Sequence, residues 1–197
     1  MDLTLLSWAR AVKARRRLAF APLWLFTDEA RVPDPLPAAR LLPRGLGGVV
    51  FRHDGAADRV GLGRKLARLC RARRLMLVVA GDARLAAALG AGLHLRRGRR
   101  PIVRRRPGLL TASAHDRSEL VRAGRAGVDL VFLGPAFATR SHVGARPLGA
   151  VRWNALAGRA RVPVAALGGV GGKTVRRLPR AAAAAAISAL EGLRARG

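Results

Sequence analysis

The sequence predicts a compact single-domain α/β protein, a (β/α)₈ TIM barrel, and three observations lead to this prediction. Eight short apolar runs recur through the 197 residues at intervals of roughly 20 to 25, with segments of helical spacing between them. Several runs are continuous, as in the strands of a parallel sheet that is buried on both faces. Polar residues other than Arg follow most of the runs, and the C-terminal ends of barrel strands are where active sites lie. An open doubly wound sheet is the alternative, but Thr27-Asp28-Glu29 stands where its Gly-x-Gly-x-x-Gly turn would be.

Residues 1–22 are expected to form a basic helical extension before the barrel of residues 23–197. Leu6, Ala9, Val12 and Lys13 have the spacing of a short amphipathic helix. Such a helix would cover the bottom of the barrel, and a role at a membrane surface is the alternative.

Strands are expected at the apolar runs, with helices between them. A barrel of this kind typically needs about 250 residues, so the loops and some helices must be short. The run Ala181–Ala186 is ambiguous, because alanine favours a helix. The expected strands are Leu23–Thr27, Gly48–Arg52, Leu75–Ala80, Gly92–Leu95, Leu109–Ser113, Asp129–Leu133, Val164–Leu167 and a weaker Ala185–Ala189, and the expected helices are Arg59–Arg73, Arg84–Leu89, Arg117–Ala126 and Val151–Ala160.

The charge balance points toward phosphate. The chain has 38 Lys+Arg against 11 Asp+Glu and a net charge of +27, which favours anionic partners. Half of the residues are apolar, which excludes a disordered basic tail. Only three of the basic residues are Lys, aromatic residues make up 4%, and Tyr is absent, so nucleic acid is an unlikely partner. A bias toward GC-rich codons accounts for Arg in place of Lys better than for the shortage of acids. Phosphorylated small molecules are the expected partners.

The remaining composition favours a cytoplasmic protein. The single Cys70 forms no disulfide within the chain, as is usual in a reducing compartment. The N-terminus does not have the pattern of a secretory signal, and apolar stretches such as Val162–Val170 are too short to span a bilayer. A homo-oligomer is possible, but the sequence does not decide the oligomeric state.

Two features of the expected rim suit phosphate. The segment Leu167–Thr174 is glycine-rich, follows a strand and opens a helix, so that its backbone N–H groups can approach an anion. An ordinary glycine-rich turn is the alternative. Ser188, at the end of the last expected strand, is a second candidate contact. Arg52 projects from a strand end, where a guanidinium needs an anionic partner.

Two further rim residues have two interpretations each. Asp82 follows a buried strand and could hold Mg²⁺, or it could cap the helix Arg84–Leu89. His115 could act as a general acid or base, or it could make only a local hydrogen bond.

The order of motifs resembles the thiamine phosphate synthase family, which includes thiazole tautomerases. The resemblance covers residues 22 to 190. Its motifs are Leu23-Trp24-Leu25-Phe26-Thr27-Asp28, Val49-Val50-Phe51-Arg52, Val78-Val79-Ala80-Gly81-Asp82, Gly92-Leu93-His94-Leu95, Thr111-Ala112-Ser113-Ala114-His115, Gly134-Pro135-Ala136-Phe137-Ala138-Thr139, Val164–Val170 and Ile187-Ser188-Ala189.

The resemblance implies a (β/α)₈ barrel and a synthase that joins a pyrimidine methyl diphosphate to a thiazole phosphate with release of pyrophosphate and the help of Mg²⁺. By correspondence, Arg52 would face the diphosphate and Asp82 the metal. Gly168, Gly169 and Ser188 would bind the thiazole phosphate. The same motifs make Ser113, Thr139 and His142 candidate substrate contacts and His115 and Arg52 candidate catalytic residues.

The sequence departs from the family pattern at the diphosphate end. Asp54 replaces a Lys, Gly81 replaces an Asn, and His142 replaces another Lys. The second metal carboxylate of the family is missing, and the segment Arg96–Arg106 carries seven Arg in its eleven positions instead. Three hypotheses therefore stay open. They are a synthase whose diphosphate site is remodelled with Arg, a tautomerase that acts through His115 without a metal, and a non-catalytic barrel that binds a phosphorylated ligand or RNA.

Overall fold

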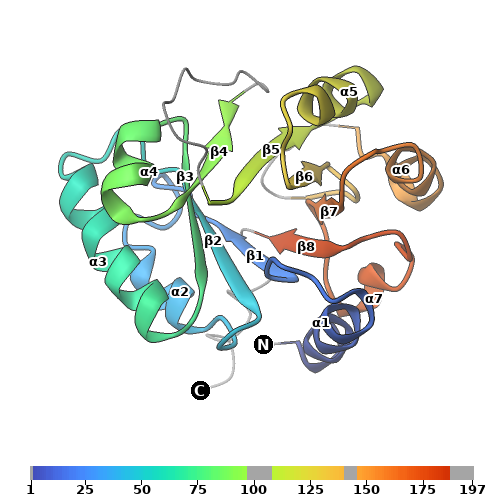
Figure 1. Cartoon of the computed structure of the whole chain (residues 1–197). Helices are drawn as coiled ribbons and strands as arrows, with labels where there is room; N and C mark the ends of the chain where they lie inside the picture. The colour runs from blue at the N-terminus through green and yellow to red at the C-terminus, as the bar shows by residue number, and fades with distance from the viewer. Residues whose placement is uncertain (1, 97–107, 140–145, 187–197) are drawn as a thin grey trace.

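The computed structural model describes residues 2–96, 108–139 and 146–186, and within them it shows a closed barrel of eight parallel strands in sequence order (Figure 1). This confirms the predicted (β/α)₈ fold. The strands are β1 Leu23–Phe26, β2 Gly47–Phe51, β3 Met76–Ala80, β4 Gly92–Leu95, β5 Leu110–Ala114, β6 Leu130–Leu133, β7 Val164–Leu167 and β8 Ala183–Ala186. The helices are α1 Leu3–Arg16, α2 Leu36–Arg40, α3 Arg59–Ala72, α4 Ala83–Leu89, α5 Arg117–Arg125, α6 Gly149–Ala157 and α7 Gly172–Val175.

Side chains from alternate strand positions fill the barrel interior. Trp24 and Phe26 of β1 meet Phe132 of β6 edge to face, with ring centroids 5.5 and 4.8 Å apart. Gly48 of β2 is the register partner of Trp24, and a Cβ at Gly48 would lie 2.7 Å from the indole ring. A glycine is therefore needed beside this tryptophan.

A second core lies between the barrel and its helices. In α3, Leu66, Ala67 and Cys70 are buried against the strands, while Arg64, Lys65, Arg68 and Arg71 are exposed. Trp153 of α6 is fully buried, and its indole N–H donates to the Leu133 carbonyl at 3.0 Å. The predicted amphipathic helices thus bury the faces that their spacing indicates. None of the helices in the described ranges is both long and apolar enough to cross a membrane.

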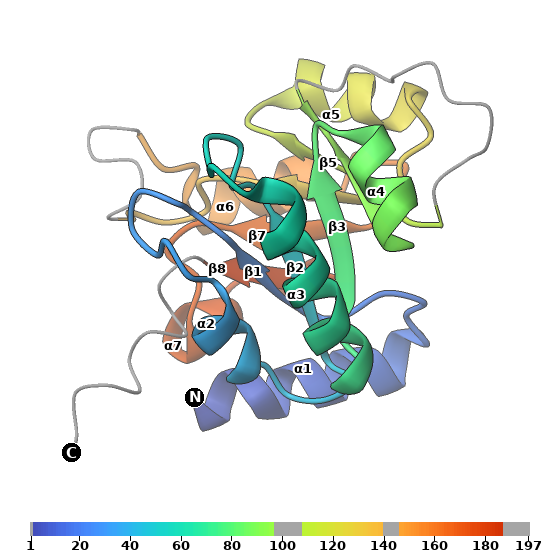
Figure 2. The ribbon, with the colours of Figure 1, turned by 90° about the vertical axis from the view of Figure 1, so that its left-hand side faces the viewer.

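Helix α1 lies along the outside of the barrel next to α7, β1 and β8 (Figures 1 and 2). Its Leu5 and Ala9 belong to the outer core together with Leu23 of β1 and Ala184 of β8. Only its C-terminal end reaches the bottom of the barrel, where Lys13 donates to the Gly45 carbonyl. The helix therefore adds to the outer ring instead of covering the bottom as the spacing suggested.

The eighth strand begins two residues earlier than the expected Ala185–Ala189. The Ala182 N–H donates to the Val164 carbonyl, and the Ala184 N–H donates to the Pro22 carbonyl, both at 2.8 Å. These bonds fix the alanine run between β7 and β1 as a strand, against its helical propensity. Identical small side chains carry no register signal, so the sequence could not place the first residue of this strand.

Candidate functional site

Thr27 connects the ends of β1 and β2 through hydrogen bonds. Its Oγ1 accepts the Arg52 backbone N–H at 2.9 Å and lies 2.9 Å from His53 Nδ1. His53 Nε2 lies 3.1 Å from the Val32 carbonyl, which only accepts, so Nε2 carries the proton. Nδ1 then accepts the Thr27 hydroxyl proton. Both ring nitrogens of His53 therefore have hydrogen-bond partners, and these bonds hold the loop after β1. The hydrogen bond to Thr27 holds the backbone of Arg52.

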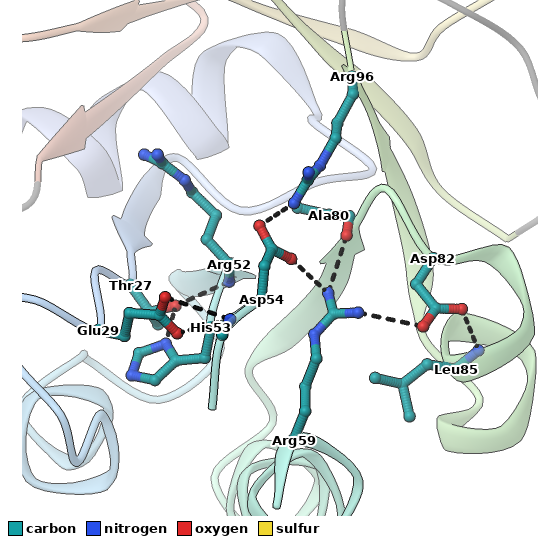
Figure 3. Close-up of polar contacts among 11 residues, drawn as sticks. Thr27, Glu29, Arg52, His53, Asp54, Arg59, Ala80, Asp82, Leu85 and Arg96 are labelled. Carbon is teal, nitrogen blue, oxygen red and sulfur yellow. Dashed lines mark hydrogen bonds and ion pairs between the residues drawn. The ribbon is translucent and has the colours of Figure 1, made fainter. Parts of the chain in front are cut away.

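The centre of the next part of the rim is Arg59, the first residue of α3 (Figure 3). Its guanidinium lies 2.9 Å from Asp54 Oδ1 and 3.1 Å from Asp82 Oδ2. It also donates to the Ala80 carbonyl at 2.9 Å, and its side chain is only 18% exposed. The second oxygen of Asp54 pairs with Arg96 at the end of β4. A chain of alternating charges therefore links the ends of β2, β3 and β4.

This charge chain borders a pocket of about 470 Å³. Its charged lining consists of three guanidinium groups and two carboxylates, so the sum of the formal charges is positive. The lining residues are Asp54, Arg59, Ala80, Gly81, Asp82, Ala83, Arg84 and Arg96.

The mouth of the barrel beside this pocket contains a buried histidine. His94 Nδ1 lies 2.8 Å from Thr111 Oγ1, and Nε2 lies 3.2 Å from Ser113 Oγ. The ring packs against the edges of Phe26 and Phe132. Burial, with the nearby positive charge of Arg52, lowers the pKa of His94 to about 3. His94 is therefore neutral at physiological pH. The Arg52 side chain is directed away from the Arg59 cluster (Figure 3).

His115 follows β5 and forms a pair with a carboxylate. Its Nδ1 lies 2.9 Å from Glu119 Oε2, and its side chain is 57% exposed. The same oxygen accepts the His115 backbone N–H at 2.8 Å, so Glu119 also closes the first turn of α5. The pair orients the imidazole through Nδ1 and leaves Nε2 as its outward nitrogen.

The glycine-rich turn after β7 packs tightly against the loop after β6. Gly168 and Gly169 have φ values of +85° and +63°. A Cβ at Gly169 would lie 2.5 Å from the Ala138 carbonyl, and one at Gly168 would lie 3.5 Å from the Thr139 methyl group. The Gly172 N–H donates to Asp2 Oδ2 at 2.7 Å, so this amide of the turn holds helix α1.

Asp82 takes the capping role. One carboxylate oxygen accepts the Leu85 N–H at 2.9 Å at the start of α4, and the other pairs with Arg59. Both oxygens are thus engaged, and a guanidinium stands where a cation would have to approach. Within the described residues, no group of three or more His, Cys, Asp or Glu side chains could hold a metal. The residues around Asp82 therefore do not fit a Mg²⁺ site.

The structure brings some of the predicted site residues together and leaves others aside. Ser113 lies 3.2 Å from His94, whose pKa is also lowered by the charge of Arg52, and Asp82 lines the pocket at the ends of β2, β3 and β4. Thr139 lies beside Gly168. His142, Ser188 and most of the Arg96–Arg106 segment lie outside the described residues. Sequence reasoning missed Arg59, although a cation in the first turn of a helix opposes the helix dipole and so indicates a nearby anion.

The fold and this rim define a TIM-barrel protein with an arginine-rich pocket at the C-terminal ends of its strands. A family model described as thiamine monophosphate synthase matches residues 25–192, and the chain belongs to that family. The resemblance seen in the motifs is thereby confirmed.

Individual relatives agree with this assignment. A thiamine-phosphate synthase from Levilactobacillus brevis is 32% identical over 155 residues, which are 72% of this chain and 70% of that protein. The thiamine biosynthesis bifunctional protein ThiED from Geobacter sulfurreducens is 36% identical over 125 residues, or 60% of this chain and 26% of that protein. The chain thus spans only part of the length of these relatives. The solved structure of thiamine phosphate pyrophosphorylase from Pyrococcus furiosus has the same fold, with a TM-score of 0.72, 24% identity and coverage of 87% and 93% of the two chains.

Proposed function

We propose that this protein is a thiamine phosphate synthase-like transferase. It would join a hydroxymethylpyrimidine diphosphate to a thiazole phosphate and release pyrophosphate. The observation that carries the proposal is the gathering of guanidinium groups where β2, β3 and β4 end, in a chain that belongs to the synthase family. Such groups suit the departing diphosphate, the most negative species in this reaction.

Each step of the proposed reaction can be assigned to particular residues at the C-terminal ends of the strands. A C–N bond forms between the two rings, and the C–O bond to the diphosphate breaks with its electron pair leaving on oxygen. Cationic donors that are already in place stabilise that developing charge without reorganising. Arg52 lies outside the lining of the arginine-rich pocket (Figure 3), so it would meet the diphosphate from the side of the barrel mouth. Ser113, Thr139, Gly168 and Gly169, with His142 and Ser188, would serve the thiazole phosphate.

Purified full-length protein, incubated with both phosphorylated substrates with and without Mg²⁺, tests this proposal. We expect pyrophosphate release and its loss in Arg52→Gln. Arg64→Gln is the matched control, since Arg64 is an exposed residue of α3. Release no greater than background, while an authentic synthase works in the same assay, would reject the transferase proposal.

The pair of His115 and Glu119 favours a second candidate, a tautomerase that moves a proton on a thiazole phosphate. The carboxylate on Nδ1 orients the ring, so that Nε2 would take and return the proton. This candidate predicts isomerisation in the presence of EDTA that is abolished in His115→Ala and weakened in Glu119→Gln. Unchanged turnover in His115→Ala would remove the histidine from the mechanism.

A further inference from the structure

The geometry points to Arg59 as a built-in replacement for the divalent metal, so that the pocket of Asp54, Arg59, Asp82, Arg84 and Arg96 binds a diphosphate group directly. The inference rests on the proposed function only for the identity of the ligand. The replacement itself is a property of the side chains and is tested without turnover.

Arg59 does for the two carboxylates what a cation would do. It bridges Asp54 and Asp82 at 2.9 and 3.1 Å. The guanidinium is held from two further sides, because it lies 5.8 Å from the centre of the Phe51 ring and donates to the Ala80 carbonyl. Its Nε is buried and has no hydrogen-bond partner among the described residues. A cation approaching Asp82 would meet a resident positive charge within hydrogen-bond distance of the carboxylate.

Gly81 allows Arg96 to complete the cluster. A Cβ at Gly81 would lie 2.4 Å from Arg96 Nε and 2.7 Å from its Cδ. The absence of a side chain at residue 81 thus gives the Arg96 side chain its path to Asp54. Gly81 also has a φ of +70°, a backbone conformation that glycine adopts readily.

The cluster leaves positive charge for a ligand. Asp54 and Asp82 pair with Arg59 and Arg96, so Arg84 is the guanidinium in excess, and both Arg84 and Arg96 are exposed in the pocket lining. Guanidinium groups bind phosphate oxygens through charge-assisted hydrogen bonds in fixed geometry. The pocket therefore offers an anion its donors, while Arg59 and Arg96 together balance the two carboxylates that would otherwise repel it.

Two probes test the replacement on the full-length protein, inorganic pyrophosphate by titration calorimetry and Mn²⁺ alone by electron paramagnetic resonance. We expect wild-type protein to bind pyrophosphate in EDTA with a Kd within about twofold of that in Mg²⁺, and to bind no Mn²⁺ at this pocket. In Arg59→Gln the carboxylate of Asp82, which then has lost its ion pair, should weaken pyrophosphate binding in EDTA by about tenfold or more, the effect of losing one charge-assisted interaction. Mg²⁺ should restore that binding, and the variant should gain Mn²⁺ binding.

The controls separate charge from folding. Arg64→Gln removes the same charge from the exposed face of α3 and should behave as wild type. Arg59→Lys keeps the charge but cannot bridge both carboxylates in the same way, and it should remain metal-independent with weaker pyrophosphate binding. Each variant is checked by circular dichroism and thermal unfolding.

The opposite results overturn the inference. Pyrophosphate binding by wild-type protein that EDTA abolishes, or Mn²⁺ binding to wild type that Asp82→Asn removes, would show a metal site. An absence of pyrophosphate binding under both conditions would also refute direct anion binding. A protein that binds pyrophosphate without metal but never turns over would support the replacement and reject only the transferase activity.

Discussion

The buried histidine in the barrel mouth predicts how stability depends on pH. His94 has an ordinary pKa of 6.5, and burial with the charge of Arg52 lowers it to about 3 in the folded protein. Below pH 6.5 the unfolded chain therefore takes up a proton that the folded chain refuses. The stability of the native state is fully present above pH 6.5 and falls as the pH drops from there toward 3. Because the pKa differs between the folded and unfolded states, the free energy of unfolding should fall by about 2 kcal/mol between pH 7.5 and pH 5.

The measurement is urea unfolding at pH 7.5 and pH 5 for wild type and His94→Gln. Glutamine retains a donor and an acceptor for Thr111 and Ser113 but does not titrate. His94→Gln can lower the free energy of unfolding at neutral pH. Between pH 7.5 and pH 5, however, its free energy of unfolding should fall by about 2 kcal/mol less than that of wild type. Equal losses in the two proteins would refute the argument, because they would show that His94 titrates alike in the folded and unfolded states.

Further outcomes are expected at four other sites. Gly48→Ala should destabilise the barrel by about 1–3 kcal/mol through its clash with Trp24, whereas Gly124→Ala in α5, with open space around it, should stabilise by about 0.5–1 kcal/mol in thermal unfolding. Thr27→Val should cost about 1–3 kcal/mol by leaving His53 Nδ1 and the Arg52 N–H unpaired, and Thr27→Ser should retain most of that stability. The pKa of Cys70 is raised to about 12 by burial, so a thiol reagent should label it only after unfolding, and rapid labelling of the native protein would contradict its position in the core.

The sequence predicted the barrel because most of its strands carry a strong local signal. Runs such as Val49–Phe51 and Val131–Leu133 are apolar at every position, as strands buried on both faces must be. The signal fails where the side chains are uninformative. β8 consists of four alanines, and α2 and α7 have five and four residues, too few for a helical period to be read.

The candidate site was predictable in its location but less so in its contacts. The rule that barrel chemistry lies at the C-terminal ends of strands selected Arg52, Ser113 and Asp82. It could not select Arg59, because this residue belongs to a helix and its sequence position is typical of a solvent-exposed basic face. The loop after β2 places the start of α3 beside β3, and this position brings Arg59 to Asp82.

The residues that differ from the family pattern depend on one another. An acid at position 54 is compatible with Arg59 and Arg96 because it lies between them, whereas the Lys of the family motif would place a third cation there. Arg96 reaches Asp54 across a position where the Asn of the motif would stand in its path. The proposed metal replacement therefore involves Asp54, Gly81 and Arg96 together, while Arg59 pairs with Asp82. Under that proposal, restoring the Asn of the motif at position 81 alone would block the path of Arg96 to Asp54 without supplying a second carboxylate for a metal, so it should disturb the pocket and not create a metal site.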